Sequence, residues 1–239
     1  MSTSLIIISL TLLAGLAMPF GALIANIEHI KVDWLEAEFR HGVIAFGGGA
    51  LLSAIALVLV PEGIQHLNVY ASSLFFIAGG FVFMTVDIIL DKFKTSASQL
   101  LAMLSDFIPE SLALGATFAI NESGAFLLAI LIALQNIPEG FNAFRELKDS
   151  SSMSASKLIV SFSLMAMLGP IAGLSGYFWL TSYPQMVAAI MLFAAGGIMY
   201  SVFQDIAPQV PLKKHWAPPI GAVFGFVLGL IGFMLTTGY

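Results

Sequence analysis

The sequence predicts an all-α membrane protein with eight transmembrane helices, and three observations support that prediction. Of its 239 residues, 59% are hydrophobic and only 10% are charged, and the mean hydropathy is +0.96. Eight apolar segments approach the roughly 20 residues that a helix needs to cross about 30 Å of hydrocarbon. The loops between these segments are short, so residues 1–239 are expected to form a single transmembrane domain.

The predicted spans follow one another along the whole chain, and each is an apolar run bounded by polar residues. Their limits are Ser4–Ile27, Val43–Val60, Tyr70–Leu90, Ser98–Ala119, Gly124–Phe144, Leu158–Thr181, Gln185–Phe203 and Ala217–Thr237. The chain contains no cysteine, which excludes disulfide bonds and thiolate metal sites.

The basic residues predict the orientation of the chain in the membrane. Every Lys and Arg lies in the first, third, fifth or seventh loop: Lys31, Arg40, Lys92, Lys94, Arg145, Lys148, Lys157, Lys213 and Lys214. Because cytoplasmic loops are enriched in Lys and Arg, these four loops are expected in the cytoplasm and both termini on the extracytoplasmic side. We expect a multi-pass protein of the plasma membrane whose partner is the lipid bilayer and not nucleic acid. The sequence does not decide the oligomeric state, and a homodimer is one possibility.

The second and seventh spans share a sequence pattern. A Phe followed by small residues begins at Phe46 and again at Phe193, and the same spacing leads to Pro61 and Pro208. With the predicted orientation these two spans run in opposite directions. The pattern favours an inverted repeat in which spans one to three correspond to spans six to eight and spans four and five form the central pair. Chance is the alternative, because small residues are common where membrane helices pack.

Two Ile-Pro-Glu triplets place Glu110 and Glu139 in the middle of the fourth and fifth spans. A carboxylate at this depth costs at least about 2.5–3.5 kcal/mol, and the proline removes a backbone hydrogen bond. Asp106 and Gln135 each lie four positions earlier and therefore share a helix face with the glutamate. Asn136, next to Gln135, points slightly away from this face. Neither span contains Lys, Arg or His. Buried carboxylates without a basic partner must be protonated or bind a cation, and both interpretations stay open.

Two further acids are candidates because of their places in the chain. Asp205 lies near the inner end of the seventh span and is a natural additional oxygen ligand, although a solvated interfacial acid is the alternative. Glu62 lies at the outer end of the second span. It either collects cations at an entrance or is an ordinary solvated residue at a helix end.

Residues 135–140, Gln-Asn-Ile-Pro-Glu-Gly, resemble the H/Q-N/D-x-P-E-G motif of the ZIP (Zrt/Irt-like) metal transporters, and residues 106–115 resemble the sister motif on the preceding helix. The resemblance extends over the full length. It implies eight helices, outside termini, a three-plus-two-plus-three inverted repeat and a two-metal site. Carried over by position, the implied ligands of the first metal are Asp106, Glu110, Gln135 and Glu139. The second metal would share Glu110 and Glu139 and add Asn136 and Asp205.

The chain departs from the family pattern on the fourth helix. Asp106 stands where the family usually has His, Phe107 where it has Asn, and Ser111 where it has Gly. The change at Phe107 weakens the second metal position. Either a single metal site or an incomplete pair of sites is therefore compatible with the sequence. Losing the imidazole makes the ligand set all-oxygen. Oxygen ligands suit harder ions, which moves the expectation from Zn²⁺ toward Mn²⁺ or Fe²⁺ without excluding zinc.

The sequence therefore predicts a transporter that moves Zn²⁺, Fe²⁺ or Mn²⁺ into the cytoplasm as its substrate, with no prosthetic group and no enzymatic activity. A proton-linked carrier of a non-metal substrate and a non-transporting membrane scaffold are the alternatives. A remoter one is an intramembrane serine protease, because residues 173–176 match the short GxSG string. A serine nucleophile needs a base within reach, and no histidine is expected at membrane depth.

Overall fold

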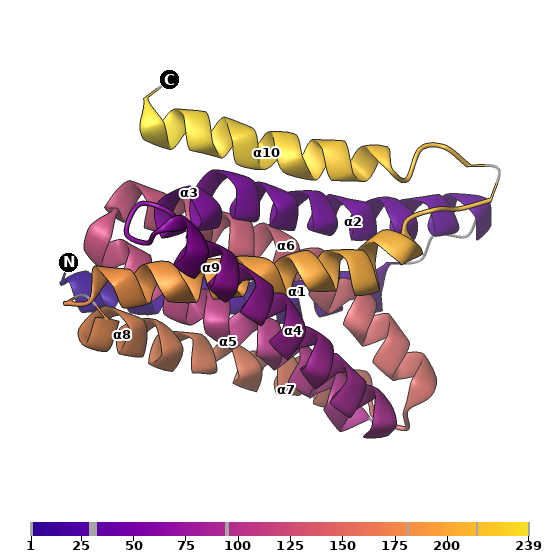
Figure 1. The fold of residues 1–239 in the computed structure, drawn as a ribbon. Coiled ribbons are helices and arrows are strands. Elements are labelled where there is room, and N and C mark those ends of the chain that lie inside the picture. Colours follow the sequence, from indigo (N-terminus) through magenta and orange to yellow (C-terminus); the bar gives the residue numbers. More distant parts are fainter. Residues whose placement is uncertain (1, 29–32, 94–95, 181, 214, 239) are drawn as a thin grey trace.

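The computed structural model describes residues 2–28, 33–93, 96–180, 182–213 and 215–238 as a bundle of long helices (Figure 1). Three of the basic residues used to predict the orientation, Lys31, Lys94 and Lys214, lie outside the described residues. The helices in chain order are α1 (Thr3–Ile27), α2 (Asp33–Ala54), η1 (Ile55–Leu59), α3 (Val60–Gly63), α4 (Val69–Phe93), α5 (Ser96–Ile120), α6 (Glu122–Ser150), α7 (Ala155–Ala166), α8 (Leu168–Leu180), α9 (Pro184–Ser201), η2 (Val202–Ile206), η3 (Ala207–Gln209) and α10 (Ile220–Thr237).

The helices coincide with the eight predicted spans and confirm an all-α, multi-pass membrane protein. In the described part of the chain, seven helical stretches are long and apolar enough to cross a membrane. The remaining long helix is α5, which has 25 residues and carries Asp106 and Glu110. The largest difference from the predicted boundaries is at the start of the second span. α2 begins at Asp33 and not at Val43, because the polar stretch before the apolar run continues the same helix.

Three spans contain an irregular turn next to a proline. In the second and seventh spans, the π-helical segments η1 and η2 immediately precede the short helices that contain Pro61 and Pro208. The sixth span is divided into α7 and α8 at Met167. Pro170, which has no backbone N–H, leaves the carbonyl of Ala166 without its usual helical donor and accounts for this break.

Four helix pairs are in close backbone contact through glycine. A Cβ atom built at Gly21 of α1 would collide with the carbonyl of Ile137, and one at Gly140 of α6 would collide with the carbonyl of Met18. Small residues let membrane helices approach this closely, and van der Waals packing then holds them together. Reciprocal glycine contacts of the same kind join three other pairs: α5 with α8 through Gly115 and Gly176, α2 with α10 through Gly49 and Gly225, and α4 with α9 through Gly79 and Gly196.

These pairs combine into two groups of helices. The α6 group contains α1, α5, α6, α7 and α8, and its members also pack as α1 on α8 and α5 on α6. The α2 group contains α2, η1, α3, α4, α9, η2, η3 and α10, and is joined internally where α3 and η1 pack on α9. The groups meet where α2 packs on α6 and α5 on α9. At that boundary Gly47 of α2 faces the ring of Pro138, a side chain and not a backbone carbonyl.

The two ends of the bundle carry different parts of the chain. Both termini and α3 lie at one end, and the C-terminal ends of α4 and α6 lie at the other (Figure 1). α4 and α10 are mostly exposed along their lengths. Their surfaces are apolar, as expected of helices that face lipid.

Candidate metal centre

A cavity of about 630 Å³ lies between the two helix groups. α5 and α6 supply one wall, and α2, α4, α9 and η2 supply the other. Its polar lining residues are Asp87, Asp91, Asp106, Glu110, Gln135, Glu139, Asn142, Glu146, Ser150, Ser201, Asp205 and Gln209. None of the described residues that line it is Lys, Arg or His. The cavity is therefore strongly acidic and favours a cationic occupant.

In the part of the chain that the structure describes, the residues that line the cavity extend toward one end of the bundle and not toward the other. On α2 its lining residues stop at Leu51, and on α5 they stop at Glu110. Toward the end that carries α3, buried apolar side chains such as Val58, Leu59 and Leu114 fill the interior. Toward the other end, the lining continues along α6 as far as Ser150. We call these the closed end and the open end.

Glu110 and Gln135 form the innermost polar pair of the cavity. The Gln135 Nε2 donates a hydrogen bond to Glu110 Oε1 at 2.5 Å, from α6 to α5. Each of the two residues is only 4% exposed. The second carboxylate oxygen, Glu110 Oε2, is buried and has no hydrogen-bond partner. A buried polar atom left unsatisfied costs about 1–3 kcal/mol, and more when charged, so this oxygen is a ready ligand for a cation.

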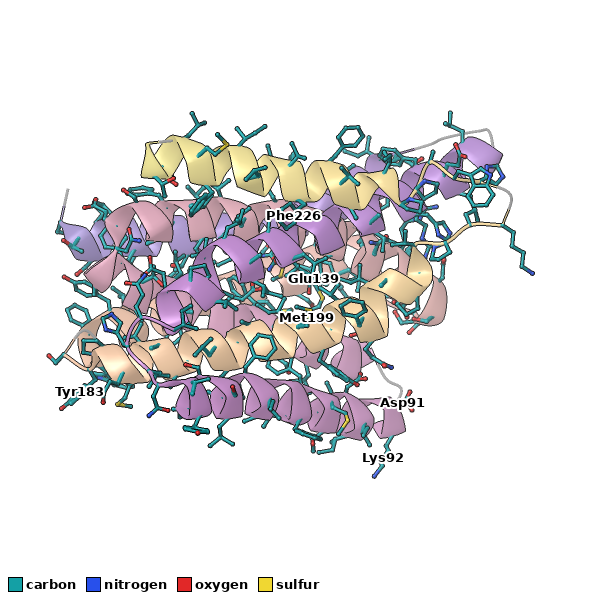
Figure 2. All side chains as sticks on the ribbon, turned by 45° about the horizontal axis from the view of Figure 1, so that its top comes forward. Asp91, Lys92, Glu139, Tyr183, Met199 and Phe226 are labelled. Atoms are coloured by element: carbon teal, nitrogen blue, oxygen red, sulfur yellow. The ribbon has the colours of Figure 1, made fainter. Side chains whose placement is uncertain are left out.

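Six further acids line the cavity with Glu110, and three of them are predicted ligands: Asp106, Glu139 and Asp205. The carboxylate of Glu139 is close enough to Asp106 and Glu110 for their charges to repel one another. Figure 2 shows Glu139 in the interior of the bundle, whereas Asp91 and Lys92 lie at its end. On the opposite wall, Asp205 is close enough to Asp106 for the same repulsion, and Ser201 lies near the Asp106 carboxylate.

These acids do not converge on one point. In the stretches of chain that the structure describes, no three or more Asp, Glu, His or Cys side chains lie close enough together to hold a metal ion between them. The predicted ligands are instead spread over the cavity: Asp106, Glu110, Gln135 and Glu139 lie on one wall, and Asp205 lies on the other. An open set of oxygen ligands can take up and release an ion more readily than a closed cage.

Asn136 is placed apart from the other predicted ligands. It is 1% exposed, and its Nδ2 donates to the carbonyl of Ala14 in α1 at 2.9 Å. It does not line the cavity, and its Oδ1 has no hydrogen-bond partner. The structure therefore brings Asp106, Glu110, Gln135, Glu139 and Asp205 to one cavity, and directs the amide of Asn136 to the neighbouring helix.

Phe107 is also directed away from the cavity. Its side chain is fully buried, and its ring tip lies where a Cβ atom at Gly15 of α1 or Gly169 of α8 would collide with it. The ring therefore fills a slot made by two glycines and holds α5 against both helices. The two positions that follow Asp106 and Gln135 in sequence, Phe107 and Asn136, are used for packing α1.

The sequence reasoning did not single out Asn142 as a site residue. Asn142 lines the cavity, and its Oδ1 is buried without a hydrogen-bond partner. Together with Gln135, Glu139 and Glu146 it forms a polar stripe with the three-to-four-residue spacing of one helix face. That periodicity was the signal in the sequence that could have found it. Ser201 had no such signal, because only the approach of α9 to α5 brings it to Asp106.

The GxSG string has a packing role in the structure. Ser175 donates its hydroxyl hydrogen to the carbonyl of Ile171 in its own helix at 2.8 Å. A Cβ atom at Gly176 would collide with the backbone of α5, and one at Gly173 with Thr11 of α1. These glycines are where α8 packs closely on its neighbours.

No protein-family model matches the chain, and no curated protein is significantly similar to it.

Proposed function

We propose that this protein is a membrane transporter that carries a divalent transition metal ion, Zn²⁺, Fe²⁺ or Mn²⁺, into the cytoplasm. The observation that carries the proposal is Glu110 Oε2, a buried carboxylate oxygen without a partner at the inner end of an acidic cavity that is open at one end. A buried anion in such a place needs a proton or a cation. Membership of the ZIP family is part of the proposal and rests on the two sequence motifs.

The ligands of the transported ion come from α5 and α6. Glu110 and Glu139 share the ion, and Asp106 and Gln135 complete its coordination from the same wall of the cavity. Asp205 lies nearer the open end and receives the ion on its way out. Asn136 stabilises α1 against α6 and contributes no ligand in this conformation. With Phe107 also directed away from the cavity, we propose that one ion is bound at a time.

The distribution of charge supports release into the cytoplasm. The open end of the cavity is the end that carries Lys92, Arg145 and Lys148. An excess of Lys and Arg marks cytoplasmic loops, so the conformation described is the one that faces the cytoplasm. The plasma membrane as the location, and the outside position of both termini, belong to the same proposal.

Alternating access follows from motion of the α6 group against the α2 group. Within each group, glycines bring the helix backbones into contact. These contacts resist sliding of one helix along the other, because a backbone carbonyl cannot rotate out of the way as a side chain can. Between the groups, the Gly47–Pro138 contact involves a side chain. Sliding at this boundary would expose the site to the closed end, as in transporters that rock one helix bundle against another.

Equivalent contacts support an inverted repeat. A separation of 147 residues relates Pro61 to Pro208, and the same separation relates the whole of η1 to η2. It also relates Gly49, which contacts α10, to Gly196, which contacts α4. Three correspondences of sequence, backbone geometry and packing at one separation favour duplication over chance.

The chemistry of the ligands selects the metal. Apart from the thioether sulfur of Met103, the polar side-chain atoms of the described cavity lining are oxygens or amide nitrogens. Hard oxygen ligands favour Mn²⁺ and Fe²⁺ relative to a site with imidazole, which favours zinc, copper or nickel. We therefore place Mn²⁺ and Fe²⁺ before Zn²⁺ as substrates.

Metal uptake into vesicles that contain the purified protein tests the proposal. Uptake of Mn²⁺, Fe²⁺, Zn²⁺ and Cd²⁺ is compared in competition, and the Glu110→Ala and Glu139→Ala variants serve as the site knockouts. The expected result is uptake by the native chain and its loss in both variants. Ordinary uptake in both variants would contradict the site. Proton flux without metal uptake would instead indicate the proton-linked carrier.

A further inference from the structure

The two helix groups are joined by a side-chain hydrogen bond at the closed end. Asn121, between α5 and α6, donates its Nδ2 hydrogen to Glu62 Oε1 at 2.5 Å. Glu62 belongs to α3, which is in the α2 group. The two residues are 59 positions apart in the chain, and both are partly buried. The bond therefore connects one group to the other.

Asn121 also organises the helix that carries Gln135 and Glu139. It is the N-cap of α6, and its Oδ1 accepts a hydrogen bond from the Gly124 backbone N–H at 2.9 Å. The two ends of one amide therefore have separate partners, one within the α6 group and one across the boundary. Glu62 anchors the connection between α5 and α6 at the point where both site helices end.

The position of this bond gives it a mechanical role. Roughly 16 Å of helix separates Glu110 from Asn121 at 1.5 Å per residue. Buried apolar side chains, including Val58 and Leu59, fill the interior over that length. An ion can reach Glu110 from the closed end only if the groups separate there. Such a separation pulls Asn121 away from Glu62. Entry from the open end, in contrast, leaves this hydrogen bond in place.

We propose that Glu62 and Asn121 form a latch that holds the closed end shut and that breaks when the site opens to that side. This inference rests on the proposed alternating-access function. A carboxylate that accepts from an amide forms one of the stronger hydrogen bonds in proteins. The latch therefore favours the conformation described here over the one open at the other end. A cation that reaches Glu62 from outside competes with Asn121 for the carboxylate and so releases it.

Cysteine accessibility tests the latch, because the native chain has no cysteine to interfere. A Val58→Cys substitution puts a small thiol into the apolar region at a residue that is 3% exposed. Its rate of modification is measured in intact cells with a membrane-impermeant thiol reagent, in metal-free medium. A His66→Cys chain, with its cysteine in the exposed turn after α3, is the positive control for access from that side.

Three variants on the Val58→Cys background separate the latch from other effects. Glu62→Ala removes the acceptor. Asn121→Asp retains a cap for α6 but cannot donate to Glu62 and adds repulsion. Glu62→Gln retains an oxygen that accepts from Asn121. The expected result is modification about tenfold faster or more in Glu62→Ala and Asn121→Asp, and a rate close to the parent in Glu62→Gln.

The outcomes distinguish the latch from the transport proposal. Unchanged modification in both Glu62→Ala and Asn121→Asp overturns the latch, whatever the uptake assay gives. Lower uptake in Glu62→Ala with unchanged modification also overturns it and assigns Glu62 to ion collection. If the modification rates are as expected but the native chain takes up no metal in the uptake assay, the latch is supported and metal transport is contradicted.

Discussion

Gln135 and Glu110 join the two site helices through a hydrogen bond of 2.5 Å between Gln135 Nε2 and Glu110 Oε1. The bond satisfies one oxygen of the carboxylate and fixes its plane, and it leaves Glu110 Oε2 free in the cavity. An amide is suited to this role because it orients the carboxylate without neutralising it. In the proposed transporter, a Lys or Arg at position 135 would neutralise the carboxylate charge that binds the cation.

The first prediction concerns this free oxygen. Glu110→Gln keeps the size of the side chain and its acceptor for Gln135, but removes the negative charge. We expect metal uptake to fall by about a hundredfold or more, because loss of a charged ligand removes several kcal/mol of ion binding. Glu122→Gln, an exposed acid in the first turn of α6, is the matched control and should transport normally. Equal uptake by the two variants would remove Glu110 from the site.

The second prediction distinguishes a packing role for Asn136 from a ligand role. Asn136→Ala loses the bond to the Ala14 carbonyl and leaves a buried gap, so the free energy of unfolding should fall by about 1–3 kcal/mol. The affinity for metal of the protein that remains folded should change little. Thermal unfolding in detergent and equilibrium metal binding measure the two effects separately. Loss of metal affinity at unchanged stability would make Asn136 a ligand.

The third prediction concerns glycine packing in the α6 group. A Cβ atom at Gly140 would collide with the Met18 backbone, so Gly140→Ala should destabilise the protein by about 1–3 kcal/mol or more. Gly42 is the matched control. Among the described residues, and apart from the backbone of its own helix, no atom lies within 4 Å of a Cβ atom built there, and Ala is the better helix former by about 1 kcal/mol. Thermal unfolding of the two variants should therefore shift in opposite directions, and equal shifts would contradict the close contact.

The fourth prediction concerns the choice of metal. Asp106→His replaces a hard oxygen ligand by an imidazole, which binds Zn²⁺ more favourably than Mn²⁺. The ratio of Zn²⁺ to Mn²⁺ uptake should rise by about tenfold, the effect of some 1.4 kcal/mol of relative affinity. Competition uptake in vesicles measures that ratio. Asp91→Asn, at the open end of the cavity, is the control and should leave the ratio unchanged. An unaltered ratio in Asp106→His would place Asp106 outside the coordination of the ion.

Much of the candidate site follows from helix periodicity. The four-residue spacing within each span places Asp106 with Glu110 and Gln135 with Glu139, and all four line the cavity. The direction of Asn136 does not follow in the same way. Neighbouring residues on a helix point about 100° apart, so a side chain next to Gln135 points toward whichever helix packs there. That helix is α1, which no local pattern identifies.

The sequence by itself determined the number of spans and the segregation of basic residues to alternate loops. It also placed two carboxylate-bearing turns in the middle of two predicted spans. These properties depend on local composition and on the length of a helix that crosses the hydrocarbon. Only the tertiary structure decided that α1 packs on α6 and α5 on α8, that the cavity opens at one end, and that Asn121 reaches Glu62. Such contacts join residues far apart in the chain, and they depend on which helix surfaces fit together closely.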